Sequence, residues 1–511
     1  MKSKGTVYLV GAGPGDVGLL TLRGAELLGR ADLVVYDALI NPELLRLAPK
    51  TAELIYGGKR SKTHTLLQGE LNALLVAKAR VGKCVVRLKG GDPYVFGRGG
   101  EEAEELAAAH IPFEVVPGIS SAVAGPNYAG IPLTHRAHCS SFTVITGHED
   151  PAKAESSVDW EQIAKIPGTK VVMMGLQHIG QIMAALMAHG VADATPVAMI
   201  RWGTTGRQQS IAATVATIAD EVVRTQFGAP AVTVIGDVVK LRGKLNWFEH
   251  RPLFGQRIVV TRSREQAGQL VRPLRELGAE VLEIPTIKIV PPTNKQDVAD
   301  ALLELNSYDW LVFTSPNGVT TFFDFFFRAF DDMRDIGGVR IAAVGPGTAA
   351  KLKELHLKVD LMPEEFLGSK IAKAFAAYES LDNLKILLLR AEVANPDLPQ
   401  ALEALGAIVD DIACYRTGPE TEDVNGAAAQ LLEHGADWLT FTSGSTVENF
   451  HARFNLPDLL KKFPQTKLAS IGPETSKALV ALNLPPTVEP KAHTMEGLVE
   501  SIANFFKRQS S

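Results

Sequence analysis

The sequence has few cysteines and no stretch long enough to cross a membrane. Its three cysteines, Cys84, Cys139 and Cys414, lie far apart and form no CxxC pair. This spacing argues against disulfides and zinc sites and is typical of a reducing compartment. All apolar runs are shorter than a membrane-spanning helix, and the short run before Gly11 does not fit a signal peptide. We therefore expect a soluble, cytoplasmic protein that binds no metal.

An excess of positive charge is also missing. The chain of 511 residues carries a formal net charge of −5, whereas binding to nucleic acid requires a basic surface. We therefore expect no nucleic-acid partner. Apolar residues, in contrast, make up 46% of the chain, which is enough to form the cores of at least two domains.

Strand-like runs alternate with helical patterns along the whole chain, which predicts an α/β fold. A boundary is expected near residues 241–256, where a polar stretch with glycine and proline precedes a new strand-like run at 257–261. We therefore predict two modules, residues 1–250 and 251–511.

The second module contains an internal repeat. Residues 259–262 match 387–390, residues 274–279 match 402–407, residues 309–315 match 437–443, and residues 344–348 match 471–475. Repeats this far apart do not form a solenoid and instead imply two similar α/β lobes. Each repeated element reads as strand, turn and helix, so we expect helix N-termini from both lobes to bind an anionic ligand between them.

Two glycine-rich turns in the first module each follow a strand-like run and precede a helical one. They read GAGPGD at 11–16 and GGDPYVFGRGG at 90–100. Such turns bring backbone N–H groups close to a ligand, which predicts a nucleotide-like small molecule and hence an enzyme. The segment 13–18 also fits a dinucleotide fingerprint, so an NAD-dependent oxidoreductase is the alternative. Asp16 argues against it, because its carboxylate would repel a pyrophosphate.

Residues 5–250 resemble the uroporphyrinogen-III C-methyltransferases, the S-adenosylmethionine-dependent enzymes of sirohaem and cobalamin synthesis. The resemblance rests on VGAGPGD at 10–16, VYDAL at 35–39, GGKR at 57–60, VRLKGGDP at 86–93, VPGISSA at 116–122, IPLTHR at 131–136 and MGL at 174–176. The segment 61–67, SKTHTLL, departs from the basic, proline-containing loop expected there. This departure concerns only how the loop would contact the substrate.

The resemblance implies a tetrapyrrole-methylase fold of two subdomains that binds S-adenosylmethionine and releases S-adenosylhomocysteine. The implied cofactor residues are Pro14, Gly90, Gly91, Asp92, Val95, Ser120, Ser121, Met174 and Gly203. Asp92 is expected to pair with a charged or hydroxyl-bearing part of the cofactor. Without a ligand, the two adjacent glycines would form a tight turn, the serines would cap a helix, and Met174 would pack in the core.

Asp37 and Lys59 match the family's proton acceptor and proton donor. We expect Asp37 to take a proton from the macrocycle, provided that burial raises its pKa; the alternative is a carboxylate that caps a strand end. The implied substrate carries eight carboxylates, so local cations are expected. The candidates are Lys59, Arg60, Lys62, His64, Arg87, His135, Arg136, Arg201 and Arg207.

Residues 256–505 resemble uroporphyrinogen-III synthase, which closes hydroxymethylbilane with inversion of ring D. The resemblance rests on VTR at 260–262, FTSPN at 313–317, AVGP at 343–346, CYRT at 414–417, FTS at 441–443 and IGPET at 471–475. It implies repeated flavodoxin-like halves, with Tyr415 assisting departure of the substrate hydroxyl. The implied substrate-binding residues are Arg262, Thr314, Ser315, Arg390, Thr442, Ser443 and Thr475.

Together the two resemblances predict a bifunctional enzyme of tetrapyrrole synthesis. The second module would form uroporphyrinogen III, and the first would methylate it at C-2 and C-7 to precorrin-2. The alternative for the second module is a catalytically silent tetrapyrrole carrier. We also expect a homodimer formed through residues 1–250, as in related methyltransferases, and we expect later pathway steps to be catalysed by other chains.

Overall fold

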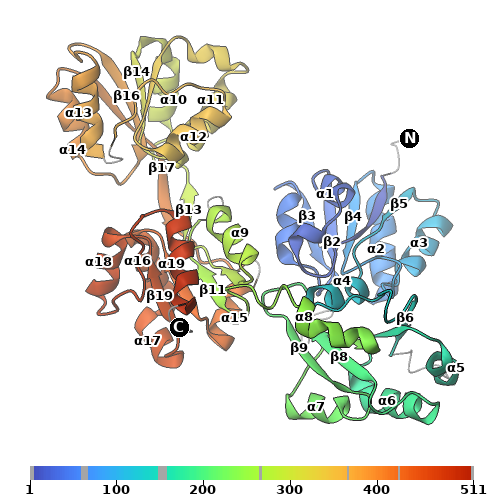
Figure 1. The fold of residues 1–511 in the computed structure, drawn as a ribbon. Helices are drawn as coiled ribbons and strands as arrows, with labels where there is room; N and C mark the ends of the chain where they lie inside the picture. Colours follow the sequence, from blue (N-terminus) through green and yellow to red (C-terminus); the bar gives the residue numbers. More distant parts are fainter. Residues whose placement is uncertain are drawn as a thin grey trace.

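The computed structural model describes residues 5–58, 67–147, 158–263, 267–364, 368–423 and 426–507. It is an α/β structure with four sheets, two in each half of the chain, and this architecture confirms the predicted fold class (Figure 1). No helix within these residues is both long enough and apolar enough to span a bilayer.

The first sheet is wholly parallel, with strand order β3-β2-β4-β1-β5. Its central strands are buried because helices cover both faces, which explains their nearly unbroken runs of apolar residues. The strands are β1 (Val7–Gly11), β2 (Leu33–Tyr36), β3 (Glu53–Tyr56), β4 (Val85–Lys89) and β5 (Phe113–Val116). The helices are η1 (Val17–Leu19), α1 (Leu22–Leu28), η2 (Pro42–Leu47), α2 (Gln68–Arg80), α3 (Gly99–Ala108) and α4 (Ser121–Tyr128).

The second sheet is mixed, with strand order β6-β7-β10-β8-β9. Only β6 and β7 pair in parallel, and the other neighbours run antiparallel. The strands are β6 (Phe142–Thr146), β7 (Thr169–Met173), β8 (Pro196–Arg201), β9 (Gln209–Thr214) and β10 (Ala231–Ile235). The helices are α5 (Trp160–Lys165), η3 (Leu176–His178), α6 (Ile179–Ala188), α7 (Ile218–Arg224), η4 (Asp237–Leu241) and α8 (Arg242–Leu245). Sheets one and two form the N-terminal module.

The C-terminal module has a proximal lobe, which contacts the N-terminal module, and a distal lobe (Figure 1). The proximal sheet, β12-β11-β18-β19, is wholly parallel. Its strands are β11 (Arg257–Val260), β12 (Glu280–Glu283), β18 (Trp438–Phe441) and β19 (Lys467–Ser470). Its helices are α9 (Gly268–Glu276), α15 (Ala427–His434), α16 (Gly444–Phe454), α17 (Leu456–Lys462), α18 (Pro473–Ala481) and α19 (Met495–Lys507).

The distal sheet has the order β13-β17-β16-β14-β15, and its edge strand β13 is antiparallel to β17. The chain passes between the lobes through these two strands (Figure 1). The strands are β13 (Ile287–Val290), β14 (Trp310–Phe313), β15 (Arg340–Ala343), β16 (Lys385–Ala391) and β17 (Ile408–Pro419). The helices are α10 (Gln296–Leu303), η5 (Leu305–Ser307), α11 (Pro316–Ala329), η6 (Met333–Ile336), α12 (Pro346–Glu354), α13 (Gly368–Tyr378) and α14 (Asp397–Glu403).

The internal repeat corresponds to equivalent strands in opposite lobes. The repeat pairs β11 with β16 and β14 with β18, and each pair divides between the proximal and the distal sheet. Within each lobe the equivalent strands are neighbours: β11 pairs with β18, and β16 pairs with β14. The repeated sequence therefore produces two similar lobes, as predicted; the distal lobe is one continuous segment, whereas the proximal lobe combines the segments before β13 and after β17.

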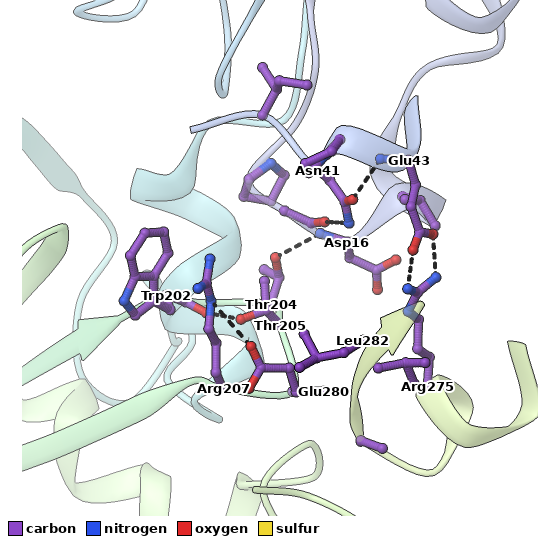
Figure 2. A pocket seen from close by; sticks show the side chains of 18 of the residues that line it. Asp16, Asn41, Glu43, Trp202, Thr204, Thr205, Arg207, Arg275, Glu280 and Leu282 are labelled. Carbon is purple, nitrogen blue, oxygen red and sulfur yellow. Dashed lines mark hydrogen bonds and ion pairs between the residues drawn. The ribbon is translucent and has the colours of Figure 1, made fainter. Parts of the chain in front are cut away.

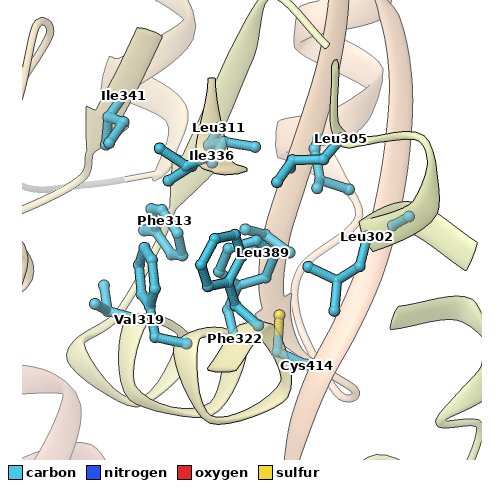
Figure 3. Close-up of a cluster of buried hydrophobic side chains, with 14 of the residues drawn as sticks. Leu302, Leu305, Leu311, Phe313, Val319, Phe322, Ile336, Ile341, Leu389 and Cys414 are labelled. Carbon is cyan, nitrogen blue, oxygen red and sulfur yellow. The ribbon is translucent and has the colours of Figure 1, made fainter. Parts of the chain in front are cut away.

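The core of the distal lobe is rich in phenylalanine (Figure 3). Phe322, Phe323 and Phe326 of α11 are buried against Phe313 of β14, with ring centroids 5.2 to 6.4 Å apart. Buried aromatic side chains remove large apolar areas from water. This cluster therefore stabilises the lobe on which Tyr415 and Ser315 are carried.

Candidate active site

The two glycine-rich turns lie against each other at the carboxyl edge of the first sheet. Gly13 N–H donates to Gly91 O at 3.2 Å, and Gly91 N–H donates to Gly13 O at 2.8 Å. The turn after β5 packs equally closely, because a Cβ on Gly118 would lie 2.1 Å from Gly91 O. Parallel sheets bind ligands at this edge. Three loops without side-chain bulk thus form one wall of a site.

Asp92 shapes the second glycine-rich turn. Its Oδ1 accepts from the backbone N–H groups of Tyr94 at 2.8 Å and Val95 at 3.1 Å, and its Oδ2 accepts from Gly118 N–H at 2.9 Å. The carboxylate therefore ties the turn after β4 to the turn after β5. The sequence led us to expect that Asp92 would pair with the cofactor, whereas in the structure both its oxygens hold backbone amides.

Asp16 closes the first glycine-rich turn. It caps η1 by accepting from Gly18 N–H at 2.8 Å, and its other oxygen accepts from the Tyr128 hydroxyl at 2.8 Å. Its own N–H donates to Thr204 Oγ1 at 3.1 Å, which links the turn to the second sheet (Figure 2). Because a separate short helix follows the turn, no long helix N-terminus points at a ligand here, unlike in a dinucleotide-binding fold.

A cavity of about 580 Å³ lies between the two sheets of the N-terminal module. All nine residues predicted to contact the cofactor line it: Pro14, Gly90, Gly91, Asp92, Val95, Ser120, Ser121, Met174 and Gly203. Ser120 also caps α4, accepting from Ala122 N–H at 3.3 Å, so the capping role predicted as its alternative is present as well. The structure thus brings together residues that are up to 189 positions apart in the sequence.

Further lining residues were not predicted to contact the cofactor. They are Gly13, Leu39, Phe96, Gly97, Gly125, Met173, Leu176, Gln177, Ile200, Trp202 and residues 229–232. Phe96, Met174 and Trp202 have left-handed backbones, with φ of 52°, 56° and 50°. Such conformations cost about 1–3 kcal/mol each and cluster at functional sites. Trp202 directly precedes Gly203, which was predicted to contact the cofactor, so its position in the sequence could have indicated that it lines the cavity.

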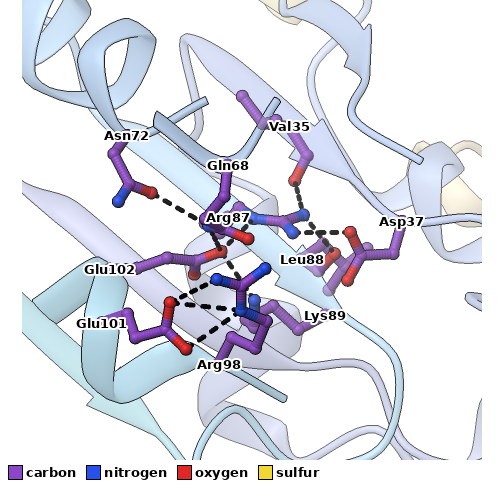
Figure 4. A network of polar contacts seen from close by, with 10 residues as sticks. All are labelled: Val35, Asp37, Gln68, Asn72, Arg87, Leu88, Lys89, Arg98, Glu101 and Glu102. Carbon is purple, nitrogen blue, oxygen red and sulfur yellow. Dashed lines mark hydrogen bonds and ion pairs between the residues drawn. The ribbon is translucent and has the colours of Figure 1, made fainter. Parts of the chain in front are cut away.

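Asp37 belongs to a buried ionic network (Figure 4). It follows β2 and its Oδ1 accepts from Arg87 at 2.5 Å. Arg87 also donates to Glu102 at 3.2 Å, and Lys89 donates to the same Glu102 oxygen at 2.7 Å. Burial, reinforced by repulsion from Arg87, lowers the pKa of Lys89. Glu102 is 0% exposed, so its charge requires both cations.

The structure describes only some of the cationic residues that were predicted to bind the substrate in this module. Lys59, Arg60, Lys62 and His64 lie outside the described residues. Arg136 is exposed in the loop between α4 and β6 and is not part of the cavity wall. Arg87 is 4% exposed and is engaged by Asp37 and Glu102. Arg87, which was predicted as a cation for the substrate, is therefore an internal ion-pair partner of Asp37, the predicted base.

In the distal lobe, Tyr415 lies beside Ser315. The two hydroxyl oxygens are 2.9 Å apart, and Ser315 caps α11 by accepting from Gly318 N–H at 3.1 Å. Tyr415 is 7% exposed, and this burial raises the pKa of its hydroxyl. Thr314 precedes Ser315 at the end of β14 and is half-buried. Tyr415 of β17 thus lies beside Ser315 and Thr314, which follow the carboxyl end of β14.

The other predicted synthase residues are divided between the lobes. In the proximal lobe, Ser443 caps α16 in the position equivalent to Ser315, accepting from Thr446 N–H at 3.3 Å. Thr442 precedes Ser443, and Thr475 is buried in α18. Arg262 follows β11, where burial lowers its pKa. In the distal lobe, Arg390 donates to Asp411 at 2.6 Å.

Two protein-family models match the chain. The model described as Tetrapyrrole (Corrin/Porphyrin) Methylases matches residues 6–219, and the one described as Uroporphyrinogen-III synthase HemD matches residues 268–500. The boundary predicted near 250 falls between these two ranges.

Curated relatives include one that matches nearly end to end. The "Porphyrin biosynthesis protein HemD" of Ruminiclostridium josui is 40% identical over 500 residues, which cover 98% of this chain and 97% of the relative. The "S-adenosyl-L-methionine-dependent uroporphyrinogen III methyltransferase" of Methanosarcina barkeri is 55% identical over 237 residues, covering 46% of this chain and 93% of the relative. The crystal structure of uroporphyrin-III C-methyl transferase from Thermus thermophilus with S-adenyl homocysteine is 38% identical, with a TM-score of 0.41, and the match covers 46% of this chain and 100% of that one.

Proposed function

The chain belongs to the porphyrin-biosynthesis proteins that join a uroporphyrinogen-III C-methyltransferase to a uroporphyrinogen-III synthase, and on this premise we propose how its modules divide the work. The C-terminal module, residues 251–511, closes hydroxymethylbilane to uroporphyrinogen III with inversion of ring D. The N-terminal module, residues 1–250, methylates this product at C-2 and C-7 to give precorrin-2. One polypeptide thus makes a substrate and consumes it.

The observation that carries the proposal is the lining of the cavity between the first two sheets. Nine residues selected for S-adenosylmethionine binding from separate sequence segments line this one cavity. Its volume of about 580 Å³ suits a nucleoside-sized ligand. The glycines at positions 90, 91 and 203 place no side chain on their parts of the wall, so backbone groups there are accessible to the cofactor.

S-adenosylmethionine supplies an electrophilic methyl group, which a nucleophilic pyrrole carbon takes up with release of S-adenosylhomocysteine. The chain has to hold the two reactants in line, and positioning can contribute about 7–11 kcal/mol. The ring that gains the methyl group must lose a proton. We assign this proton to Asp37, whose carboxylate is oriented by Arg87 at 2.5 Å. Lys59 is assigned the opposite role of proton donor.

Cyclisation in the C-terminal module breaks the C–O bond of the hydroxymethyl group. Water leaves, ring D is attacked through a spiro intermediate, and the rearrangement inverts that ring. We propose that Tyr415 donates a hydrogen bond to the departing hydroxyl. Burial raises the pKa of Tyr415, so its hydroxyl keeps its proton, and Ser315 orients it at 2.9 Å.

The first test is product analysis from hydroxymethylbilane generated in situ, with and without S-adenosylmethionine, by mass spectrometry and isomer-resolving chromatography. We expect isomer III without the cofactor and a doubly methylated product with it. Isomer I alone, the product of spontaneous closure, would show that the C-terminal module is not a working synthase, and intact tetrapyrrole binding would then favour the silent carrier. Supplied uroporphyrinogen III then tests methyl transfer independently of cyclisation.

We also propose that the enzyme is a cytoplasmic homodimer that associates through the N-terminal module, as expected from its resemblance to other methyltransferases. Light scattering at micromolar concentration should give the mass of two chains. The mass of one chain would contradict this assembly without affecting either activity assignment.

A further inference from the structure

The two modules meet at a charged junction to which each contributes an arginine and a glutamate, and Figure 2 shows one of its ion pairs, Arg275 with Glu43. Arg275 at the end of α9 forms an ion pair with Glu43 of η2. In return, Arg46 of η2 contacts Glu283 of β12 at 2.7 Å, and Arg275 lies 3.5 Å from Glu283. The Glu283 side chain is 3% exposed and that of Glu43 is 18% exposed, so both carboxylates are better shielded from water than those of typical surface pairs.

A backbone contact beside the charges shows that the junction is closely packed. Gly206, in the connection between β8 and β9, approaches the start of β12 so closely that a Cβ would lie 2.2 Å from Glu280 N. The neighbouring Arg207 stacks on Trp202 at 3.7 Å and lies 4.0 Å from Glu280 Oε1. The proximal lobe therefore contacts the N-terminal module through both backbone and charge.

Both contacts lead directly to the cavity assigned to methyl transfer. Glu43 N–H donates to Asn41 Oδ1 at 3.1 Å, and Asn41 Nδ2 donates to Gly15 O at 2.8 Å, in the first glycine-rich turn. The residues between Asp37 and Asn41 include Leu39, which lines that cavity. On the other side, Thr204 accepts from Asp16 N–H in the same turn.

We propose that Arg275, a residue of the C-terminal module, is a positioning residue for methyl transfer in the N-terminal module. It holds Glu43, and through Glu43 it orders the segment 38–47 that follows the predicted base. A second cavity of about 210 Å³ lies at this junction and shares Pro14, Leu39 and Trp202 with the larger one. The C-terminal module therefore lines a cavity that adjoins the site assigned to methyl transfer. This inference rests on the proposed function.

The test compares full-length wild-type protein with Arg275→Ala, Arg275→Lys and the charge exchange Glu43→Arg/Arg275→Glu. For Arg275→Ala we expect kcat for methylation of supplied uroporphyrinogen III to fall about 10-fold to 100-fold, because small displacements of a site reduce rates to this extent. Arg275→Lys and the charge exchange should recover part of that loss. The cyclisation rate should stay at the wild-type value, since it does not depend on the position of segment 38–47.

Arg272→Ala is the matched control. Arg272 lies on the same helix, is 85% exposed and pairs only with Glu276 of α9 in the described contacts, so its loss should leave methylation unchanged. Amide hydrogen exchange of residues 38–47 supplies a readout that needs no activity. We expect faster exchange there in Arg275→Ala and wild-type exchange in Arg272→Ala.

Unchanged exchange and unchanged kcat in Arg275→Ala would overturn the proposal. An equal loss of kcat in the charge exchange and in Arg275→Ala would also overturn the proposal, because the pair would then not act through its charges. A wild-type protein that fails to methylate uroporphyrinogen III would instead contradict the proposed function. In that case the exchange experiment still decides whether Arg275 orders the segment.

Discussion

Arg87 holds the carboxylate of Asp37 at 2.5 Å from the neighbouring strand of the first sheet (Figure 4). Arg87 is 4% exposed and is itself held by Glu102, whereas Asp37 is 30% exposed at the end of β2. The predicted base is therefore anchored on one side by the protein interior and remains accessible on the other. An ion pair of this kind restricts the orientation of the carboxylate.

Replacing Asp37 with asparagine keeps the shape of the side chain but removes its basicity. We expect kcat for methylation of uroporphyrinogen III to fall about 10²-fold to 10⁴-fold, with an unchanged Kd for S-adenosylhomocysteine. Product formation followed by mass spectrometry, with calorimetry for binding, measures both. Asp220→Asn, an exposed position on α7, is the control. Full activity in Asp37→Asn would show that Asp37 only caps the end of the strand.

Replacing Gly118 with alanine should disturb the turn that lines the cofactor cavity. The new Cβ would lie 2.1 Å from Gly91 O, so the backbone of one turn must move. We expect a loss of stability of about 1–3 kcal/mol and at least a tenfold weaker Kd for S-adenosylhomocysteine, measured by thermal unfolding and calorimetry. Gly100→Ala is the control, because its Cβ would enter open space on α3. An unchanged Kd in Gly118→Ala would show that this turn does not shape the cofactor site.

The ionised carboxylate of Glu249 should stabilise the N-terminal module, and acid should remove this stabilisation. Burial alone would raise its pKa, but hydrogen bonds from Arg242, Ser210, Gln208 and Asn246 outweigh burial and hold the pKa below its usual value. A lowered folded pKa contributes stability above the unfolded value of about 4.3 and loses it as the pH falls through the folded value. We therefore expect Glu249→Gln to cost at least about 1.5 kcal/mol near neutral pH, and this difference should shrink on acidification.

Urea unfolding at several pH values measures this difference. The matched control is Glu161→Gln, which breaks an exposed pair with Lys165 on α5 and should leave stability nearly unchanged, because water and salt screen such pairs. A cost for Glu249→Gln that does not change with pH would refute the assignment to an ionised carboxylate.

Replacing Tyr415 with phenylalanine should slow cyclisation without abolishing it. The hydroxyl that Ser315 orients at 2.9 Å is lost, and we expect a rate reduced by about 10²-fold, with more isomer I from spontaneous closure. Tyr378→Phe, on α13 and 53% exposed, is the control. Burial raises the pKa of Tyr415 above its ordinary value of 10.0, so no ionisation of this residue should appear in the rate profile between about pH 6 and about pH 9. An unaltered isomer ratio would show that Tyr415 has no part in cyclisation and is only a buried core residue.

Much of the fold could be predicted because it depends on local pattern. Alternating strand-like and helical runs predicted the α/β class, and the repeat predicted two similar lobes, which the sheets confirm. The repeat did not reveal that the proximal lobe is assembled from two separated segments, with the whole distal lobe between them. A sequence offset shows which segments are alike, whereas strand pairing decides which of them become neighbours, and β11 pairs with β18 across most of the module.

The nine residues predicted to contact the cofactor came from the family resemblance, and five of them lie in the two glycine-rich turns. Glycine turns at strand ends are visible in the sequence, and parallel strands bring such turns to one edge of a sheet. The partners of charged side chains were not found in this way. Arg390 was expected to bind a substrate carboxylate, and the structure pairs it with Asp411 of the adjacent strand.

The sequence by itself thus determined the α/β class, the two glycine-rich turns and the lobe repeat. These follow from periodicity and from the backbone freedom of glycine. Only the tertiary structure decided that Arg87 holds Asp37, that Asp92 binds backbone amides, and that Arg275 reaches Glu43 from the other module. Each of these contacts joins residues far apart in the chain, and side-chain geometry across an interface leaves no periodic signal in the sequence.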